Sequence, residues 1–153
     1  MFIREAHVSD IPQIQRVRNA VKENRLSSPS VVSDEDCELY LTKRGKGWVA
    51  IIHGNVVAFA IADLLDHNIW ALFVDPFFEC QGIGKQLQYI MLHWYFSQTD
   101  KPVWLGTAPH TRAEVFYRRT GWIEAGMNGK SEVRFEMTFE IWETLQQNDL
   151  KQK

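Results

Sequence analysis

A strand that leads into a glycine-containing turn and then into a helix constrains the fold of this chain more than any other feature. Residues 69–74 are apolar enough to predict a buried strand, which ends before Pro76. Gly82 and Gly84 follow with one residue between them, and apolar side chains then recur at helical spacing. Glycine lets a ligand approach the main chain closely, and the first N–H groups of a helix are unpaired and lie at the positive end of its dipole. The pattern therefore predicts a phosphate site at this turn, with a plain tight turn as the alternative.

Two common phosphate-binding motifs do not match this turn. A P-loop requires Ser or Thr directly after its Gly-Lys pair, but Gln86 follows Lys85 here, and no glycine stands at the required earlier position. A dinucleotide fingerprint requires a third glycine or an alanine where this chain has Leu87. The expected ligand is therefore a different phosphate-bearing molecule.

A second motif lies in residues 110–122, where Ala113, Phe116, Tyr117 and Gly121 stand at fixed spacing. It resembles the late helix of the GNAT superfamily of N-acetyltransferases, Asn-x-x-Ala-x-x-(aromatic or Leu)-Tyr-x-x-x-Gly-Phe. The glycine turn resembles the (Gln/Arg)-x-x-Gly-x-(Gly/Ala) signature with which the same superfamily holds the pyrophosphate of acetyl-coenzyme A. Together the two resemblances cover about residues 69–122.

The composition favours one soluble globular domain. The chain has 153 residues, 45% apolar and 24% charged, so we expect a single domain over residues 1–145 and a polar tail over residues 146–153. A net charge of −2 without basic runs argues against a nucleic-acid partner, and no apolar run is long enough for a membrane span. Cys37 and Cys80 are too few for a metal site or a disulfide framework. The first residues lack the apolar core of a signal peptide, so the expected compartment is the cytoplasm.

Hydrophobic periodicity predicts the element order β-α-α-β-β-β-α-β-α-β-β. The GNAT resemblance implies the corresponding α/β (α+β) fold, with a mixed, mostly antiparallel central sheet of six or seven strands flanked by about four helices. The first helix is predicted to begin at Ser9 or Asp10 and the second at Ser33. A hairpin turn is predicted at Gly54-Asn55. The expected strands are residues 2–6, 48–52, 56–62, 69–74, 103–105, 122–125 and 133–138; the later helices are residues 82–97 and 113–119; a loop is expected over residues 25–32, and a strand end or short helix over residues 139–145.

The resemblance implies acetyl-coenzyme A as co-substrate and no metal. The pyrophosphate would lie on main-chain N–H groups of the glycine turn. The pantetheine arm would pair with the preceding strand, whose main chain would also polarise the acetyl carbonyl. Arg112 would reach the coenzyme phosphates, with an exposed arginine as the alternative. The residues implied for coenzyme binding are Leu72, Phe73, Val74, Gln81, Gly82, Ile83, Gly84, Lys85 and Arg112.

Tyr117 is the residue that the resemblance places near the coenzyme sulfur. A phenol has a pKa of about 10 and is protonated at neutral pH, so Tyr117 is the expected general acid for the leaving thiolate. A packing aromatic is the alternative. His110 stands where many relatives have Asn, and it is expected to contact the coenzyme or to act as a base, unless it only begins the helix.

The general base is the least specified part of the predicted site. Some relatives carry a carboxylate on the central strand, but residues 68–71 contain none. Asp63, at the end of the preceding strand, is the expected catalytic candidate. His53, His67 and Asp66 are alternatives, and an ordered water would also serve.

Two residues depart from the GNAT signature. Glu79 stands where Gln or Arg is usual, and Cys80 where Gly is common. A carboxylate repels a pyrophosphate, so we expect weaker coenzyme affinity while the main-chain site stays intact. Cys80 is not expected to be a nucleophile, because direct transfer needs no acyl-enzyme.

The motifs and their resemblance together imply an acyltransferase. The expected reaction moves an acetyl group directly from acetyl-coenzyme A to a primary amine, and the expected partner is a small-molecule amine rather than a nucleic acid or a membrane. A longer acyl group is one alternative; a non-catalytic acyl-coenzyme-binding or regulatory module is another. Many relatives dimerise through sheet edges, so a homodimer is one expected assembly.

Overall fold

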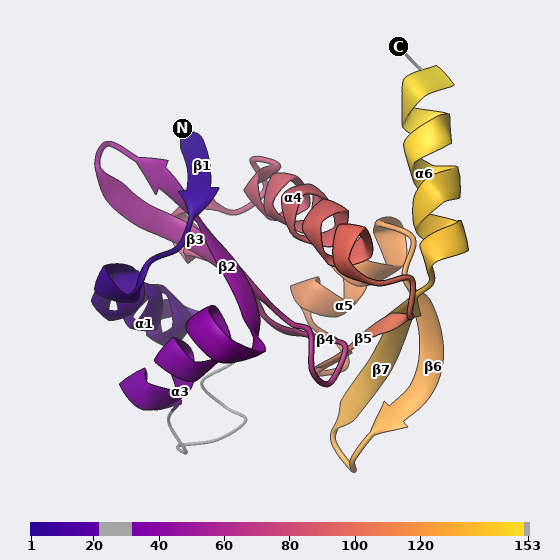
Figure 1. Ribbon diagram of the computed structural model, residues 1–153, viewed down its shortest axis with the longest axis horizontal. Coiled ribbons are helices and arrows are strands. Elements are labelled where there is room, and N and C mark those ends of the chain that lie inside the picture. Colours follow the sequence, from indigo (N-terminus) through magenta and orange to yellow (C-terminus); the bar gives the residue numbers. More distant parts are fainter. Residues whose placement is uncertain (22–31, 152–153) are drawn as a thin grey trace. The chain divides into compact units, whose positions relative to one another are not determined.

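The first part of the chain folds into four antiparallel strands in the order β1-β2-β3-β4 (Figure 1). The structure, a computed structural model, describes residues 1–21 and 32–151, arranged in two compact units, Met1–Tyr95 and Phe96–Lys153. Most of the predicted loop over residues 25–32 lies outside the described residues. The strands of the first unit are β1 (Phe2–Glu5), β2 (Gly45–Ile52), β3 (Asn55–Asp63) and β4 (Asn68–Val74).

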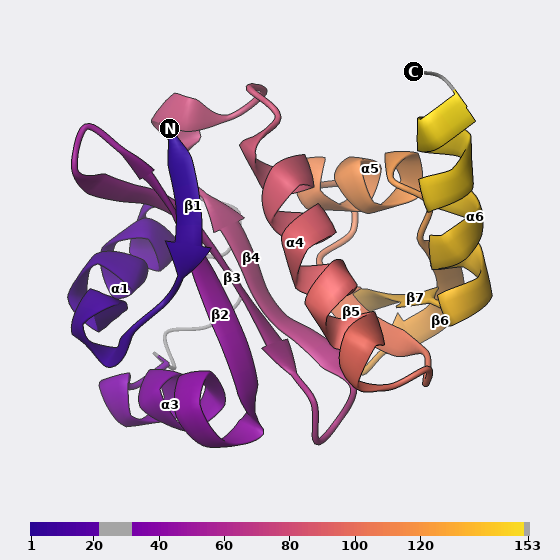
Figure 2. The same ribbon diagram turned by 45° about the horizontal axis from the view of Figure 1, so that its top comes forward.

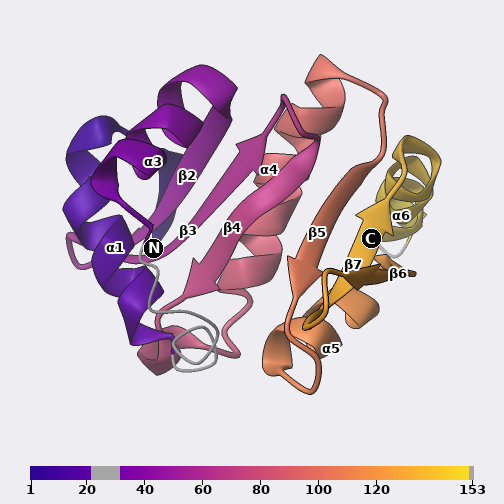
Figure 3. The same ribbon diagram turned by 90° about the horizontal axis from the view of Figure 1, so that it is seen from below.

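Helices cover both faces of this four-stranded sheet. Figures 2 and 3 show α1 (Ile11–Ala20) and α3 (Asp34–Leu39) on one face and α4 (Ile83–Gln98) on the other. Alternation along the strands explains the two layers, because successive side chains point to opposite faces. Val49 joins the core under α1 and α3, whereas the neighbouring Trp48 packs edge-on against Trp94 of α4, with ring centroids 5.6 Å apart. Strand β3 is therefore buried continuously from Val56 to Asp63.

One of the two predicted helix starts in this unit is capped by its own side chain, and the other is not. The hydroxyl of Ser33 accepts a hydrogen bond from the N–H of Asp36 at 3.0 Å, which caps α3 as predicted. Asp10 occupies the N-cap position of α1, but its carboxylate makes no bond to that helix. It accepts instead from Arg4 at 2.8 and 2.9 Å and from the N–H of His7 at 2.8 Å.

The hairpin between β2 and β3 turns one residue earlier than predicted. Ile52 pairs with Asn55, so the turn consists of His53 and Gly54. Both have positive φ, 50° and 80°, as a two-residue hairpin turn of the right twist requires. The prediction of Gly54-Asn55 was wrong, because pairing of the flanking residues rather than the Gly-Asn pair sets the register.

The second unit contains the strand order β5-β7-β6, again antiparallel. Its elements are β5 (Val103–Thr107), α5 (Arg112–Arg119), β6 (Ile123–Asn128), β7 (Glu132–Met137) and α6 (Phe139–Lys151). Helix α5 ends before Gly121, whose φ of 98° suits a residue that follows a helix.

Helix α6 forms where a strand end or a short helix was expected, and it is longer than that short helix. The hydroxyl of Thr138 accepts from the N–H of Ile141 at 3.1 Å, so the helix begins at Phe139 and continues through much of the expected tail. The predicted element order is otherwise confirmed. Seven strands are present in the described residues, and all pairings within each unit are antiparallel, as expected for the mixed α/β fold. The single domain over residues 1–145 stays a prediction.

Candidate active site

Two hydrogen bonds of Asp75 fix the start of the turn after β4. The N–H of Asp75 donates to the carbonyl of Val57 at 2.8 Å, and its carboxylate accepts from the N–H of Phe77 at 2.9 Å. This carboxylate caps the short 3-10 turn Pro76–Phe78. The chain is thereby fixed at the end of the strand, and the glycine turn starts from a defined position.

The glycine turn faces open space and leaves main-chain N–H groups available. Gly82 has φ of 82°, and a Cβ placed there would meet no atom within 4 Å. The first bond of α4 runs from the N–H of Gln86 to the carbonyl of Gly82 at 3.1 Å. No described residue accepts a hydrogen bond from the N–H groups of Ile83, Gly84 or Lys85. These groups and the helix dipole can therefore bind an anion.

Side chains of the turn differ in exposure. Ile83 is buried, which anchors the start of α4 in the core, while Gln81 and Lys85 are exposed. Glu79 is half-buried. Cys80 is exposed and has φ of 63°, a left-handed conformation that non-glycine residues rarely adopt. Such strain often marks ligand-binding turns, and sequence reasoning gave no sign of it.

The strand that leads into the turn carries a β-bulge. Ile69 pairs with Ala62 and Ala71 with Ile61, so Trp70 is an extra residue on β4. Beyond the bulge, the main chain of Leu72, Phe73 and Val74 pairs regularly with β3. The three residues are half-buried, and the ring of Phe73 packs at 5.5 Å from that of Phe59.

Tyr117 lies in the aromatic core of the second unit. Its ring centroid is 5.3 Å from that of Phe116, 5.7 Å from Trp122 and 6.1 Å from Phe135. No described residue forms a hydrogen bond with its hydroxyl. Burial raises the pKa of Tyr117 well above its ordinary value, so the phenol is protonated throughout the physiological range.

His110 and Arg112 stand at the start of α5. His110 is exposed with φ of 63°, and its N–H donates to the carboxylate of Glu114 at 3.1 Å. Thr111 rather than His110 is the N-cap, since its hydroxyl accepts from the N–H of Glu114 at 3.3 Å. The imidazole of His110 is therefore not occupied by capping. Arg112 is exposed.

Asp63 is at the opposite end of β4 from the glycine turn, because it pairs with Asn68. Its carboxylate is fully buried, at 0% exposure, and accepts from Nη2 of Arg44 at 2.9 Å and from the N–H of Leu65 at 3.0 Å. These bonds tie the β3–β4 turn together. For Asp63 to act as a base, its carboxylate would first have to give up the hydrogen bond from Arg44.

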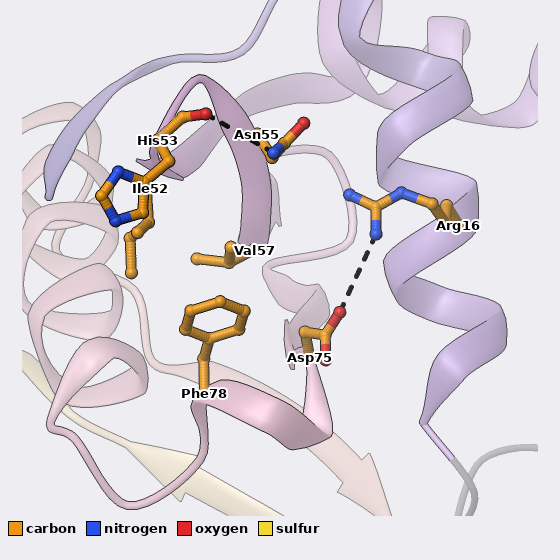
Figure 4. Close-up of a pocket in the computed structure, with 7 residues that line it drawn as sticks. All are labelled: Arg16, Ile52, His53, Asn55, Val57, Asp75 and Phe78. Atoms are coloured by element: carbon orange, nitrogen blue, oxygen red, sulfur yellow. Dashed lines mark hydrogen bonds and ion pairs between the residues drawn. The ribbon is translucent and has the colours of Figure 1, made fainter.

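The three alternative bases have separate surroundings in the first unit. The Nδ1 atom of His67 lies 3.0 Å from the hydroxyl of Tyr95, and Asp66 pairs with Arg44 at 3.1 Å. His53 lines a cavity of about 300 Å³ beside Phe78 and the Arg16–Asp75 ion pair of 3.9 Å (Figure 4). None of the nine predicted coenzyme-binding residues lines this cavity.

Arg18 is a residue that sequence reasoning missed. Its Cζ atom lies 5.2 Å from the ring centroid of Trp70 and 5.1 Å from that of Phe73, and its Nε is buried without a hydrogen bond. An arginine on a helix gives no sequence signal for such a contact.

Among the described residues, no group of three or more His, Cys, Asp or Glu side chains could hold a metal ion. No helix in the described ranges is long and apolar enough to cross a membrane.

Comparisons with known proteins agree with this architecture. The family model of the acetyltransferase (GNAT) family matches residues 12–122. The PaiA N-acetyltransferase of Thermoplasma acidophilum, solved with coenzyme A, is 14% identical with a TM-score of 0.76; the match covers 90% of this chain and 98% of that one. The Escherichia coli ribosomal-protein-S18-alanine N-acetyltransferase is 19% identical with a TM-score of 0.69, covering 89% and 90%.

A GNAT-family acetyltransferase of Staphylococcus aureus Mu50 is 21% identical with a TM-score of 0.77, covering 90% of this chain and 98% of that one. A comparison with curated protein sequences found no match. The predicted fold class and superfamily are confirmed, since the family model spans most of the chain: it belongs to the acetyltransferase (GNAT) family and is an acyltransferase.

Proposed function

We propose that this acyltransferase moves an acetyl group directly from acetyl-coenzyme A to the primary amine of a small molecule. The observation that carries the proposal is the open turn at Gly82, where the N–H groups of Ile83, Gly84 and Lys85 have no described partner. Such a turn suits a pyrophosphate. The coenzyme A in the PaiA structure supports the choice of ligand.

Acetyl-coenzyme A supplies a thioester whose carbonyl carbon the amine attacks. In our proposal the main chain of Gln81 to Lys85 binds the pyrophosphate and that of residues 72–74 binds the pantetheine arm. Arg112 adds charge near the phosphates. A main-chain N–H of residues 72–74 polarises the acetyl carbonyl as negative charge develops on its oxygen.

Tyr117 is the proposed acid. The new C–N bond forms as the C–S bond breaks, and the departing sulfur takes up a proton. A buried phenol with a raised pKa and no described hydrogen-bond partner can supply that proton, or a strong hydrogen bond, at neutral pH. His110 is proposed to contact the coenzyme through its exposed imidazole.

The amine must lose a proton before or during attack. Asp63 is one proposed base, but its bonds to Arg44 and Leu65 occupy the carboxylate. A water chain to solvent is the other route. Neither route requires a residue of the glycine turn.

Calorimetric titration with acetyl-coenzyme A tests the proposal directly. Saturable binding at micromolar to millimolar ligand is expected, and its absence at millimolar ligand would end the proposal. Release of free thiol in the presence of a panel of primary amines then tests turnover.

Binding without any thiol release across the panel would instead indicate a non-catalytic acyl-coenzyme-binding module. The cytoplasm as compartment and a homodimer as assembly stay predictions.

A further inference from the structure

Arg18, in the last turn of α1, carries a charge for which the described part of the chain supplies no anion. Its guanidinium is half-buried and lies over the rings of Trp70 and Phe73, at 5.2 and 5.1 Å. Its buried Nε makes no hydrogen bond. Buried charges are normally paired, because leaving water without a partner is costly. Contact with aromatic faces offsets only part of that cost.

The other arginines that the structure describes in this unit are all paired with a carboxylate. The pairs are Arg4–Asp10 at 2.8 Å, Arg16–Asp75 at 3.9 Å and Arg44–Asp63 at 2.9 Å. Arg18 therefore departs from the rule that its own unit follows.

The thiol of Cys37 does not supply the missing charge. Cys37 is fully buried, and burial raises its pKa above the ordinary value even though the Arg18 charge acts in the opposite direction. The thiol is therefore neutral at neutral pH. Burial also lowers the pKa of Arg18, which starts so high that the guanidinium stays charged.

The position of Arg18 connects it to the proposed acetyl site. Phe73 is the middle residue of the β4 segment to which we assign the pantetheine arm, and Trp70 is the bulge just before it. Tyr40 stacks on Trp70, with its ring centroid 4.0 Å from that of Trp70 and the rings 8° from parallel. The guanidinium is thus held against the strand that would present the acetyl group.

We propose that Arg18 binds a carboxylate of the acceptor, so that the acceptor is a primary amine that also carries a carboxylate, as an amino acid does. This inference rests on the proposed function of the same site. A planar guanidinium fits a carboxylate with two parallel hydrogen bonds, and Trp70 and Phe73 offer apolar surface to the rest of such a molecule.

The test compares two amines that differ only in the carboxylate, L-phenylalanine and 2-phenylethylamine. Specificity constants, kcat/KM, are measured for the wild-type protein and for the variants Arg18→Met, Arg18→Lys and Arg134→Met. Arg134 is a matched control, because its Cζ lies 4.4 Å from the ring centroid of Trp104 while its Nε is paired with Glu136 at 3.3 Å.

The wild-type protein should favour the carboxylate-bearing amine, and Arg18→Met should reduce kcat/KM for it about 10- to 100-fold, the usual effect of losing a hydrogen bond to a charged group. The constant for 2-phenylethylamine should not change. Arg18→Lys should restore part of the preference, and Arg134→Met should leave it intact. An equal loss on both amines, or no preference in the wild-type protein, would overturn the inference.

A binding measurement keeps the result independent of turnover. Calorimetry with N-acetyl-L-phenylalanine and with N-(2-phenylethyl)acetamide, in the presence and absence of coenzyme A, should show tighter binding of the carboxylate that disappears in Arg18→Met. Coenzyme binding without this difference refutes the carboxylate site and leaves the proposed function standing. Failure of acetyl-coenzyme A to bind refutes the proposed function. The titrations of the two N-acetyl ligands without coenzyme A then still show whether Arg18 binds the carboxylate.

Discussion

The carboxylate of Asp63 lies 2.9 Å from Nη2 of Arg44 and is completely buried, whereas the guanidinium is partly exposed. Asp63→Asn should lower the free energy of unfolding by about 1–3 kcal/mol, because a charge-assisted hydrogen bond is weakened at a buried position. Urea unfolding measures this loss.

Asp66→Asn is the matched control for Asp63. Asp66 binds the same guanidinium at 3.1 Å, but its side chain is 71% exposed. Exposed ion pairs contribute little, so the variant should change stability by no more than about 0.5 kcal/mol. If Asp63→Asn instead left stability unchanged and abolished turnover, Asp63 would be the base rather than a tie for the β3–β4 turn.

Tyr117→Phe should lower kcat about 10- to 100-fold while the dissociation constant for acetyl-coenzyme A changes little, since the hydroxyl would act only on the departing sulfur. Stability should be preserved, because no described residue bonds to this hydroxyl. Tyr95→Phe is the control, as its hydroxyl lies 3.0 Å from Nδ1 of His67. That variant should lose stability and keep kcat. Unchanged turnover in Tyr117→Phe would remove the residue from the acid role.

The sequence was sufficient for features whose causes are local. Ser33 caps a helix through a bond to a residue three positions later, and Gly82 permits a left-handed turn wherever it stands. Helix α6 also had a local signal, the Thr138 cap, but the pattern after it favoured no single structure. The hairpin turn at His53 was missed because the register of the flanking strands decides it.

Arg18 could not have been predicted in the same way. Its partners, Trp70 and Phe73, are far away in the sequence, and only the packing of α1 on the sheet brings them together. No residue pattern in the sequence predicts that the guanidinium of Arg18 will have no carboxylate partner among the described residues. For a site of this kind, the informative quantity is an unsatisfied group in the folded chain.

Alkaline pH should destabilise the protein through Tyr95. Burial, with a smaller effect of the Asp63 charge, raises the pKa of Tyr95 to about 12. The unfolded chain loses this proton near pH 10 and therefore binds fewer protons than the folded chain between pH 10 and 12. The contribution of Tyr95 to stability is present in full below pH 10 and is lost as the pH rises through this window, by about 2–3 kcal/mol.

Unfolding by urea at pH 8 and pH 11 measures this alkaline loss. Tyr95→Phe should reduce the difference in unfolding free energy between the two pH values. An identical pH dependence in the variant and in the unaltered chain would show that Tyr95 does not carry the effect. Burial also raises the pKa of Tyr117. The double variant with Phe at positions 95 and 117 should therefore show a still smaller change in unfolding free energy between the two pH values.

The glycine turn allows a test that separates backbone strain from coenzyme binding. Gly82 and Gly54 have φ of 82° and 80°, and a Cβ at either position would meet no atom within 4 Å. Alanine should therefore destabilise both turns similarly, by about 1–2 kcal/mol, because the strain is in the backbone and not in a clash. Only Gly82→Ala should weaken the binding of acetyl-coenzyme A, with a dissociation constant about 10-fold higher. The reason is that the N–H groups of the turn would move relative to the pyrophosphate. Titration calorimetry on the two variants makes the comparison, and equal affinities would mean that the turn does not hold the coenzyme.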